Sequence, residues 1–230
     1  MKKILDTLKL KWAEYLLETL VITFGVLGAF ALNNWNEQRK DRVTEKEILQ
    51  NVVDNLEVNL QKLESYIALN ERCDMSSDVI LSALENKITY SDSLDQHFGW
   101  GLTVQDPDTG LSFVGYEAMK NAGLEIVLNK SLKKEIINLF EGTYQKYLQR
   151  NDNAMLLRVE ITKLRQERFL RGSNFSFSPF DFDSLLKDKF FYSWLHTIVD
   201  TRAWINYSIK ESYSETQRIL QLLKDELHEN

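Results

Sequence analysis

Glycine, proline and cysteine are scarce in this sequence of 230 residues, which has 9 glycines, 2 prolines and one cysteine, Cys73. A β-sandwich or β-barrel needs a turn about every 8–12 residues, and turns rely on glycine and proline, so these folds are excluded. One thiol cannot close an internal disulfide, which excludes a disulfide-rich scaffold. With 43% hydrophobic residues the chain can still build a core. The sequence therefore predicts an all-α protein.

An excess of positive charge and the common catalytic motifs are also absent. The 28 basic residues are outnumbered by 34 acidic ones, and phosphate repels an acidic chain, so nucleic acid is excluded as a partner. The sequence has no glycine-rich phosphate loop, no metal-binding pair of closely spaced histidines or cysteines, and no Gly-x-Ser-x-Gly elbow. His97, His196 and His228 lie far apart. We therefore expect no enzyme, metal or cofactor; a membrane-bound hydrolase built on carboxylates is the remaining enzymatic alternative.

One hydrophobic run near the N-terminus has the length of a membrane span. From Leu16 to Leu32 the sequence reads LLETLVITFGVLGAFAL, in which Glu18 is the only charged residue. A helix rises about 1.5 Å per residue, so the stretch between Trp12 and Trp35 is roughly 35 Å long, slightly more than the hydrocarbon core of a bilayer. Both tryptophans then lie near the interfaces, where their rings are favoured. The run predicts a transmembrane helix over residues 16–35, held in membrane lipid.

Two alternatives to a membrane span stay open at this stage. The run could be a buried core helix of a soluble protein, although such a helix normally carries polar residues at helical spacing. It could also be a signal peptide, because Ala29-Phe30-Ala31 has the small-x-small form of a cleavage site. Glu14 and Glu18 within or beside the run argue against cleavage, as does the lack of a turn residue between the run and Thr44.

Basic residues flank the predicted span on both sides. The segment over residues 1–15 contains Lys2, Lys3, Lys9 and Lys11, and the other flank contains Arg39, Lys40, Arg42 and Lys46. Cytoplasmic flanks are normally the richer in Lys and Arg, and here the counts are equal. The free amine adds positive charge at the N-terminus, which favours a cytoplasmic N-terminus in a bacterial inner membrane and a C-terminal domain outside the cytoplasm. Trp12, Trp35, Arg39 and Lys40 are the predicted interface anchors.

The exit of the span resembles a known motif. Asn33-Asn34-Trp35-Asn36-Glu37, followed by Arg39-Lys40 and preceded by Glu18 and a span rich in Val, Ile, Gly and Leu, is similar to an uncharacterised bacterial family of single-pass membrane proteins. That family has an Asn-Asn-Trp-Asn-Glu motif after its transmembrane helix. Leu17-Glu18-Thr19 departs from the Gly-Glu with which the family tends to begin its span. The resemblance implies an architecture and no activity.

A second similarity to this family lies further along the chain. Residues Tyr116–Gly123 read YEAMKNAG and residues Asn129–Leu132 read NKSL, at a place where the family has a helix, a glycine and the start of another helix. The resemblance therefore implies a boundary between two helices near Gly123.

Residues 36–230 are predicted to form a helical soluble domain. Apolar residues recur at intervals of three and four along three stretches, which places them on one face of each helix. The stretches are a stalk helix over residues 43–86, a long helix over residues 131–171 and C-terminal helices over residues 183–228 with an interruption near Asp200, while residues 87–130 are irregular with short helices. Long helices joined by short connections are typical of an α-helical bundle.

Helix boundaries in this domain are predicted from local signals. No breaker separates the span from the stalk, so one continuous helix is expected; the alternative is a new helix at Thr44-Glu45-Lys46-Glu47, which has capping-box form. Ser93-Leu94-Asp95-Gln96 has the same form. Asp106–Gly110 is a turn rather than a calcium loop, whose glycine would come one residue later. Arg171-Gly172-Ser173 is expected to end the long helix.

Aromatic residues are concentrated after this predicted helix end. Phe175, Phe177, Phe180 and Phe182 are expected to plug the end of the helical core. Phe190 and Trp204 are assigned to the core face of the last helices.

Glu18 is the polar residue with the clearest functional implication. A charge inside hydrocarbon costs about 2.5–3.5 kcal/mol, so such a residue tends to face protein or water. Glu18 could reach water at the headgroups, and Glu14 lies one turn before it. In an oligomer, Glu14 and Glu18 are instead pore candidates, because a ring of carboxylates attracts cations.

Small residues on the same span favour self-association. Gly25, Gly28 and Ala29 form a small surface, and Gly25-x-x-x-Ala29 has the spacing that lets helix backbones approach closely. The leading hypothesis is a membrane-anchored helical scaffold or sensor that acts through protein–protein interaction, as a homo-oligomer and with an unknown protein partner. The alternative is an oligomeric cation channel or membrane effector.

Overall fold

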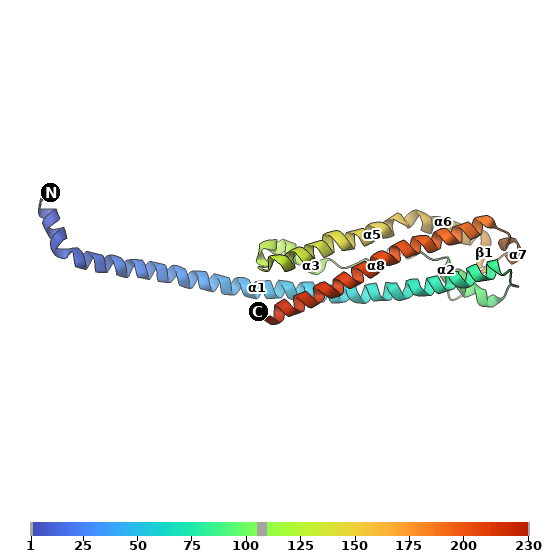
Figure 1. Cartoon of the computed structure of the whole chain (residues 1–230), viewed down its shortest axis with the longest axis horizontal. Helices are drawn as coiled ribbons and strands as arrows, with labels where there is room; N and C mark the ends of the chain where they lie inside the picture. Colours follow the sequence, from blue (N-terminus) through green and yellow to red (C-terminus); the bar gives the residue numbers. More distant parts are fainter. Residues whose placement is uncertain (1, 105–109, 230) are drawn as a thin grey trace. The chain divides into compact units, whose positions relative to one another are not determined.

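The computed structural model describes the backbone of residues 2–104 and 110–229, and the side chains of residues 12–104 and 110–228. The described chain is helical almost throughout, which confirms the all-α fold class. It divides into two units, residues 1–48 and 49–230, and each is described by itself (Figure 1). The predicted turn at Asp106–Gly110, apart from Gly110, and the side chains of the four N-terminal lysines lie outside the described residues.

The first unit is the N-terminal part of helix α1 (Lys2–Glu85). Its apolar side chains are exposed; Phe24 and Phe30 each keep 70% of their surface accessible, and Leu32 keeps 68%. Within the described residues, α1 is the one helix long and apolar enough to cross a membrane. It is therefore a candidate membrane span, and its exposure argues against a core helix buried within this chain.

Helix α1 continues without a break through Thr44–Glu47, so the capping-box alternative at this place is wrong. Thr44 Oγ1 donates a hydrogen bond to the Lys40 carbonyl oxygen at 3.1 Å, which is the bond of a threonine inside a helix and not of an N-cap. The helix persists because residues 33–85 contain no glycine or proline.

The second unit is a helical bundle built on residues 49–85 of α1, on α5 (Tyr144–Asn153) and α6 (Met155–Arg168), and on the long α8 (Lys189–Glu229) (Figure 1). Three side-chain contacts show that α8 runs antiparallel to α1: Tyr192 bonds Glu85, Arg202 bonds Asp74, and Lys224 bonds Glu57. Apolar side chains on the facing sides of α1 and α8 are buried; they are Leu49, Val52, Leu56, Leu63, Ile80, Phe191, Leu195, Ile198, Ile205, Ile209, Ile219 and Leu223.

The long helix predicted over residues 131–171 is divided in the structure. Helix α4 (Lys130–Ile137) is followed by a π-helical turn, η3 (Asn138–Thr143), and then by α5 and α6, which separate at the buried Ala154. Asn129 caps α4 by accepting a hydrogen bond from the Leu132 amide at 3.1 Å. The wider π turn keeps Phe140 in the core, where its ring stacks on Tyr116 at a centroid distance of 4.5 Å.

The prediction that this helix reaches Arg171 is wrong, because α6 ends at Arg168. Residues Phe169–Arg171 form strand β1, which pairs antiparallel with β2 (Phe177–Pro179) in the register Phe169↔Pro179. The intervening turn is closed by the Gly172 amide, which donates to the Ser176 carbonyl oxygen at 2.9 Å. Pairing with a later segment therefore overrides the local helical pattern.

The aromatic residues around this hairpin are only partly in the core. Phe177 and Phe182 are buried, Phe175 is half-buried, and Phe180 keeps 63% of its surface exposed. The expectation that all four rings plug the bundle is therefore wrong for Phe180. Phe169 is buried in addition and lies 5.0 Å from the Phe98 ring.

Two predictions for the C-terminal helices are wrong: the interruption near Asp200, and the core position of Phe190 and Trp204. Helix α7 (Phe182–Leu185) is short, and α8 continues through Asp200 without a break. Phe190 and Trp204 lie on α8 but keep 60% and 67% of their surface exposed, because the apolar stripe of α8 is wider than the face that the bundle covers.

Residues 86–126 contain the short elements η1 (Asp92–Leu94), α2 (Asp95–Gly101), α3 (Val114–Ala122) and η2 (Leu124–Ile126). The capping box at Ser93 is not formed; Ser91 is the N-cap and accepts from the Ser93 amide at 3.4 Å. Helix α3 ends before Gly123, whose φ of +96° is accessible to glycine at no steric cost. A helix, a glycine and a new helix therefore follow in the order that the family resemblance implies.

Two buried asparagines of α1 hold the segment that leads into α3. Asn55 and Asn59 each donate to the Ser112 carbonyl oxygen at 2.9 Å. In return, the Ser112 amide donates to Asn59 Oδ1 at 2.7 Å and the Gly115 amide donates to Asn55 Oδ1 at 2.8 Å. These four bonds satisfy the buried polar groups and fix the register of α3 on α1.

The buried Tyr144 makes the free energy of unfolding depend on pH in the alkaline range. Its hydroxyl lies 2.7 Å from Thr216 Oγ1, and burial raises the pKa of Tyr144 to about 12. An unfolded chain loses this proton near pH 10, so stability is complete below that pH and falls as the pH rises from about 10 to 12, by at most about 1.4 kcal/mol per pH unit for one proton. Denaturant unfolding between pH 9 and 12 should show a shallower decline for Tyr144→Phe; an unchanged slope would contradict this assignment.

Candidate functional site

The predicted intramembrane residues all lie on the exposed part of α1. Glu14 and Glu18 are one turn apart, and both side chains are exposed. A Cβ added at Gly25 or Gly28 would meet no atom of the described chain within 4 Å, so no contact within the described residues requires a glycine at either place. The ring of Glu18 side chains stays a prediction. Ion flux through liposomes, compared between wild type and Glu18→Gln, tests that alternative.

Two of the predicted interface anchors, Trp35 and Arg39, form a pair along α1. The guanidinium of Arg39 lies 5.9 Å from the centre of the Trp35 ring, which is a cation–π distance. Asn33 Nδ2 donates to Glu37 Oε1 at 3.0 Å. Trp12, Trp35, Arg39 and Lys40 are all exposed. Asn33 and Glu37 of the Asn-Asn-Trp-Asn-Glu motif therefore pair across one helical turn, and Trp35 of the motif pairs with Arg39 four residues later.

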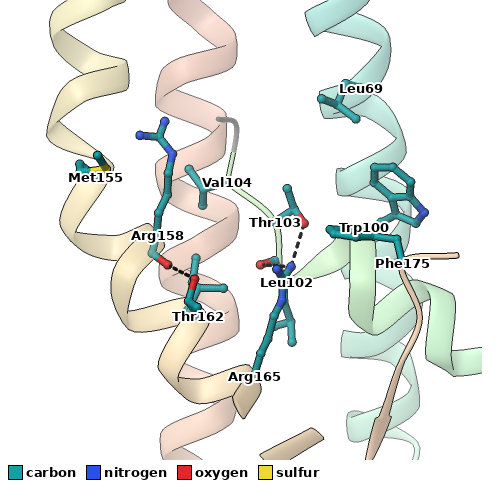
Figure 2. A pocket seen from close by; sticks show the side chains of 11 residues that line it. Leu69, Trp100, Leu102, Thr103, Val104, Met155, Arg158, Thr162, Arg165 and Phe175 are labelled. Atoms are coloured by element: carbon teal, nitrogen blue, oxygen red, sulfur yellow. Dashed lines mark hydrogen bonds between the residues drawn. The ribbon is translucent and has the colours of Figure 1, made fainter. Parts of the chain in front are cut away.

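The second unit contains a pocket of about 410 Å³ (Figure 2). Its described wall consists of Leu69 of α1, Trp100 of α2, Leu102, Thr103 and Val104, then Met155, Arg158, Ile161, Thr162 and Arg165 of α6, and Phe175 of the hairpin turn. None of these eleven residues is acidic, although the chain carries a net charge of −6. The pocket therefore combines an apolar and aromatic wall with two guanidinium groups. Sequence analysis did not predict it.

Arg165 is the central polar residue of this pocket. Its Nη2 donates to the carbonyl oxygens of Gly99 and Leu102 at 2.8 and 2.7 Å, and to Thr103 Oγ1 at 2.8 Å. The guanidinium also lies 4.9 Å from the centre of the Phe177 ring. Burial lowers the pKa of Arg165 to about 10, so the group is still a cation at neutral pH.

The cation of Arg165 has no carboxylate partner among the described residues. Its Nε is buried and has no hydrogen-bond partner within residues 12–104 and 110–228. Burying a charge without a counter-ion is costly, and each missing hydrogen bond adds to that cost. The pocket wall therefore presents positive charge that the described protein does not neutralise.

Arg158 lines the same pocket but is held differently. Its Nη1 donates to the Asn151 carbonyl oxygen at 2.9 Å, and its Nη2 donates to Asn151 Oδ1 at 2.5 Å. Figure 2 shows both arginines rising from α6, with Thr162 between them and the guanidinium of Arg165 beside Thr103. The two terminal nitrogens of Arg158 are thus engaged by one residue of α5.

A third arginine, Arg202 of α8, lies behind the pocket and is completely buried. It donates to Asp74 Oδ1 at 2.5 Å, to Ser77 Oγ at 2.6 Å and to the Thr103 carbonyl oxygen at 2.8 Å. A longer bond of 3.3 Å reaches the Gly101 carbonyl oxygen. Arg165 and Arg202 therefore cap the carbonyl groups at the C-terminal end of α2 from two sides.

Cys73 is a free, buried cysteine that is influenced by these charges. It is buried, and burial raises the pKa of its thiol, even though Arg202 and Arg165 act in the opposite direction. A thiolate is the nucleophilic form, so a raised pKa makes Cys73 less reactive. Within the described residues no group of three or more His, Cys, Asp or Glu side chains is arranged to hold a metal ion.

The exposed surface of the bundle carries a second cluster, made of Arg150 of α5 with Trp204 and Tyr207 of α8. The Arg150 guanidinium lies 5.6 Å from the centre of each ring. It also donates to Ser208 Oγ at 2.5 Å. Trp204 and Tyr207 keep 67% and 65% of their surface exposed, and they line an open depression of about 380 Å³. We call this the Trp204 cluster.

Sequence signals for these sites differ in strength. Arg202 falls between Ile198 and Ile205 on the buried stripe of α8, so its core position could have been found from helical spacing. Arg165 is followed by the polar residues Gln166 and Glu167 and resembles an ordinary surface arginine. Its burial depends on the hairpin turn and on the end of α2, which are distant in sequence.

Comparison of the chain with models of protein families, with curated proteins and with solved structures finds no match. The family resemblance of the Asn33–Glu37 motif therefore stays a prediction.

Proposed function

We propose that the protein is a single-pass membrane protein whose helical domain is a scaffold or sensor that acts through protein–protein interaction. The observation that carries the proposal is that α1 bears a fully exposed apolar segment at Leu16–Leu32 and a buried core face from Leu49 onward. Soluble monomers rarely expose a continuous apolar surface of this extent. Lipid is the environment that would cover it.

The Trp204 cluster supports the interaction part of the proposal. Trp, Tyr and Arg are the residues most often found at the energetic centres of protein interfaces. In this cluster one of each is present, and both rings are largely exposed.

Self-association is the second part of the proposal. Gly25, Gly28 and Ala29 leave the backbone of α1 accessible, and glycine inside a helix costs about 1 kcal/mol relative to alanine. A close helix–helix contact in lipid would explain why glycine occupies these positions. We further propose that the protein resides in a bacterial inner membrane with its N-terminus in the cytoplasm, and protease protection in sealed vesicles tests this orientation.

Alkaline extraction of the full chain from vesicles tests the anchor. We expect wild type to stay with the vesicles after a carbonate wash. Phe24→Arg combined with Leu27→Arg should release most of the protein, because two charges then lie in the middle of the span. Leu222→Arg, which changes an exposed leucine of α8, is the matched control and should stay with the vesicles. Release of intact wild type would overturn the proposal.

Cross-linking in the same vesicles tests self-association independently. Gly28→Leu should weaken self-association by about tenfold, because the added side chain separates the helices. Thr23→Leu enlarges an exposed side chain on the opposite face of α1 and should leave self-association intact. Equal cross-linking of both variants, or a wild type that yields monomer alone, would remove self-association from the proposal while leaving the anchor in place.

A further inference from the structure

We propose that the pocket between α2 and α6 binds a small organic monoanion, a carboxylate on a compact apolar body, and that the guanidinium of Arg165 receives the carboxylate. This inference goes beyond anchoring and protein contact, because it assigns a ligand site within the helical domain.

The first argument is the state of Arg165. Three oxygen atoms accept hydrogen bonds from its Nη2, and all are neutral: two carbonyls and the hydroxyl of Thr103. Nε, which is buried, has no partner among the described residues. Arg165 is half-buried, and a partly desolvated cation held only by neutral groups gains from an anion that reaches it, because charge-assisted hydrogen bonds are about twice as strong as neutral ones.

The second argument concerns the charge of the ligand. Arg158 is the other cation on the wall, and both of its terminal nitrogens already bond Asn151. All the described hydrogen bonds of Arg165 come from its Nη2, so its Nη1 is the terminal guanidinium nitrogen left for an incoming anion. A phosphate monoester carries close to two charges at neutral pH and needs more donors than this wall offers, whereas a carboxylate carries one charge.

The third argument concerns the body of the ligand. Trp100 and Phe175 lie together on one side of the pocket, with ring centres 4.8 Å apart, as Figure 2 shows. Leu69, Met155 and Ile161 complete an apolar surface. The volume of about 410 Å³ is within the roughly 300–1,000 Å³ of small-molecule sites. A wall of this kind favours an aromatic ring or a short alkyl chain over a polar body.

The charge of the whole protein makes the inference specific. With 28 basic and 34 acidic residues, the chain repels small anions on average. Saturable binding of an anion therefore reports a local positive site and not general attraction.

Isothermal titration of the full chain in a neutral detergent tests the proposal. Phenylacetate is the aromatic probe and octanoate the aliphatic one, and they distinguish the two sources of an apolar carboxylate. Phenylacetamide matches phenylacetate in shape but has no charge, and inorganic phosphate supplies charge without an apolar body. We expect saturable binding of at least one carboxylate, and binding of phenylacetamide and phosphate weaker by about tenfold or more.

A pair of matched variants links the binding to Arg165 without removing it. Thr162 is exposed, lines the pocket and lies one turn before Arg165 on α6. Thr162→Glu places a carboxylate beside the guanidinium and should weaken binding about tenfold or more relative to Thr162→Gln, which has the same size and no charge. Partition of the probe into detergent micelles affects both variants equally and cancels in the comparison.

Three outcomes would overturn the proposal: no saturable binding of either carboxylate to folded wild type, phosphate binding as tight as that of the carboxylates, or equal affinity of Thr162→Glu and Thr162→Gln. None of these results bears on membrane extraction or cross-linking, so the ligand site and the proposed function fail separately.

Discussion

Replacing Arg202 by methionine is expected to lower the free energy of unfolding by about 3 kcal/mol, at the lower end of the range of about 3–5 kcal/mol for removing one partner of a buried ion pair. The side chain of Arg202 is completely buried, whereas that of Asp74 keeps 39% of its surface exposed, so water can solvate the carboxylate that remains. Ser77 and the Thr103 carbonyl oxygen would lose a donor in the interior. Denaturant unfolding of the full chain in detergent measures the change.

Arg218→Met is the matched control for this prediction. Arg218 lies on the same helix and bonds Glu135 and Glu215 at 2.6 and 2.8 Å, but its side chain keeps 46% of its surface exposed. Exposed ion pairs contribute about 0–1 kcal/mol, so this variant should be close to wild type. An equal loss of unfolding free energy in Arg202→Met and Arg218→Met would show that burial does not determine how much the Arg202 contacts stabilise the protein.

Replacing Gly115 by alanine is expected to cost about 1–3 kcal/mol, because α3 approaches α1 too closely for a side chain. A Cβ at Gly115 would lie 2.3 Å from the carbonyl oxygen of Asn51 and 2.8 Å from its carbonyl carbon. These are backbone atoms inside α1 and cannot rotate away. The shift needed to relieve the clash would also lengthen the bond from the Gly115 amide to Asn55.

Gly142→Ala is the matched control and is expected to cause no loss of stability. Gly142 lies in the π-helical turn η3, and an added Cβ would meet nothing within 4 Å. Alanine is favoured over glycine in a helix by about 1 kcal/mol, so this variant should be as stable as wild type or slightly more stable. Thermal unfolding of both variants tests the pair, and a stable Gly115→Ala protein would contradict the close contact between α3 and α1.

Helical periodicity was sufficient to predict the fold class and most of the buried face. Leu49, Val52 and Leu56 recur at intervals of three and four, Leu63 follows two turns later, and all four are buried. Phe190 and Trp204 follow the same pattern and are exposed, because periodicity marks a stripe on a helix but does not state how much of it a neighbour covers. The width of the covered face depends on how α5 and α1 pack against α8.

Features set by distant residues could not be predicted from local sequence. Phe169-Leu170-Arg171 continues the pattern of α6, yet these residues pair with Phe177–Pro179 as a strand. Arg165 acquires its environment from Gly99, Leu102 and Phe175, which are between 10 and 66 positions away along the chain. Ser91 and not Ser93 is the N-cap of η1, and Asp95, at the end of this element, bonds Tyr90 and the distant Ser178.

The capping of α2 by two distant arginines has a consequence for the order in which the domain assembles. The last carbonyl groups of this short helix are satisfied by side chains 63 to 101 residues further along the chain, and a seven-residue helix is too short to persist by itself. Contacts that close loops of this length form late in folding, because the chain entropy lost on closing the loop must be offset by other contacts that form at the same time. The part of the pocket wall at Leu102 and Thr103 is therefore completed only when the C-terminal third of the polypeptide, which contains both arginines, has packed against α2.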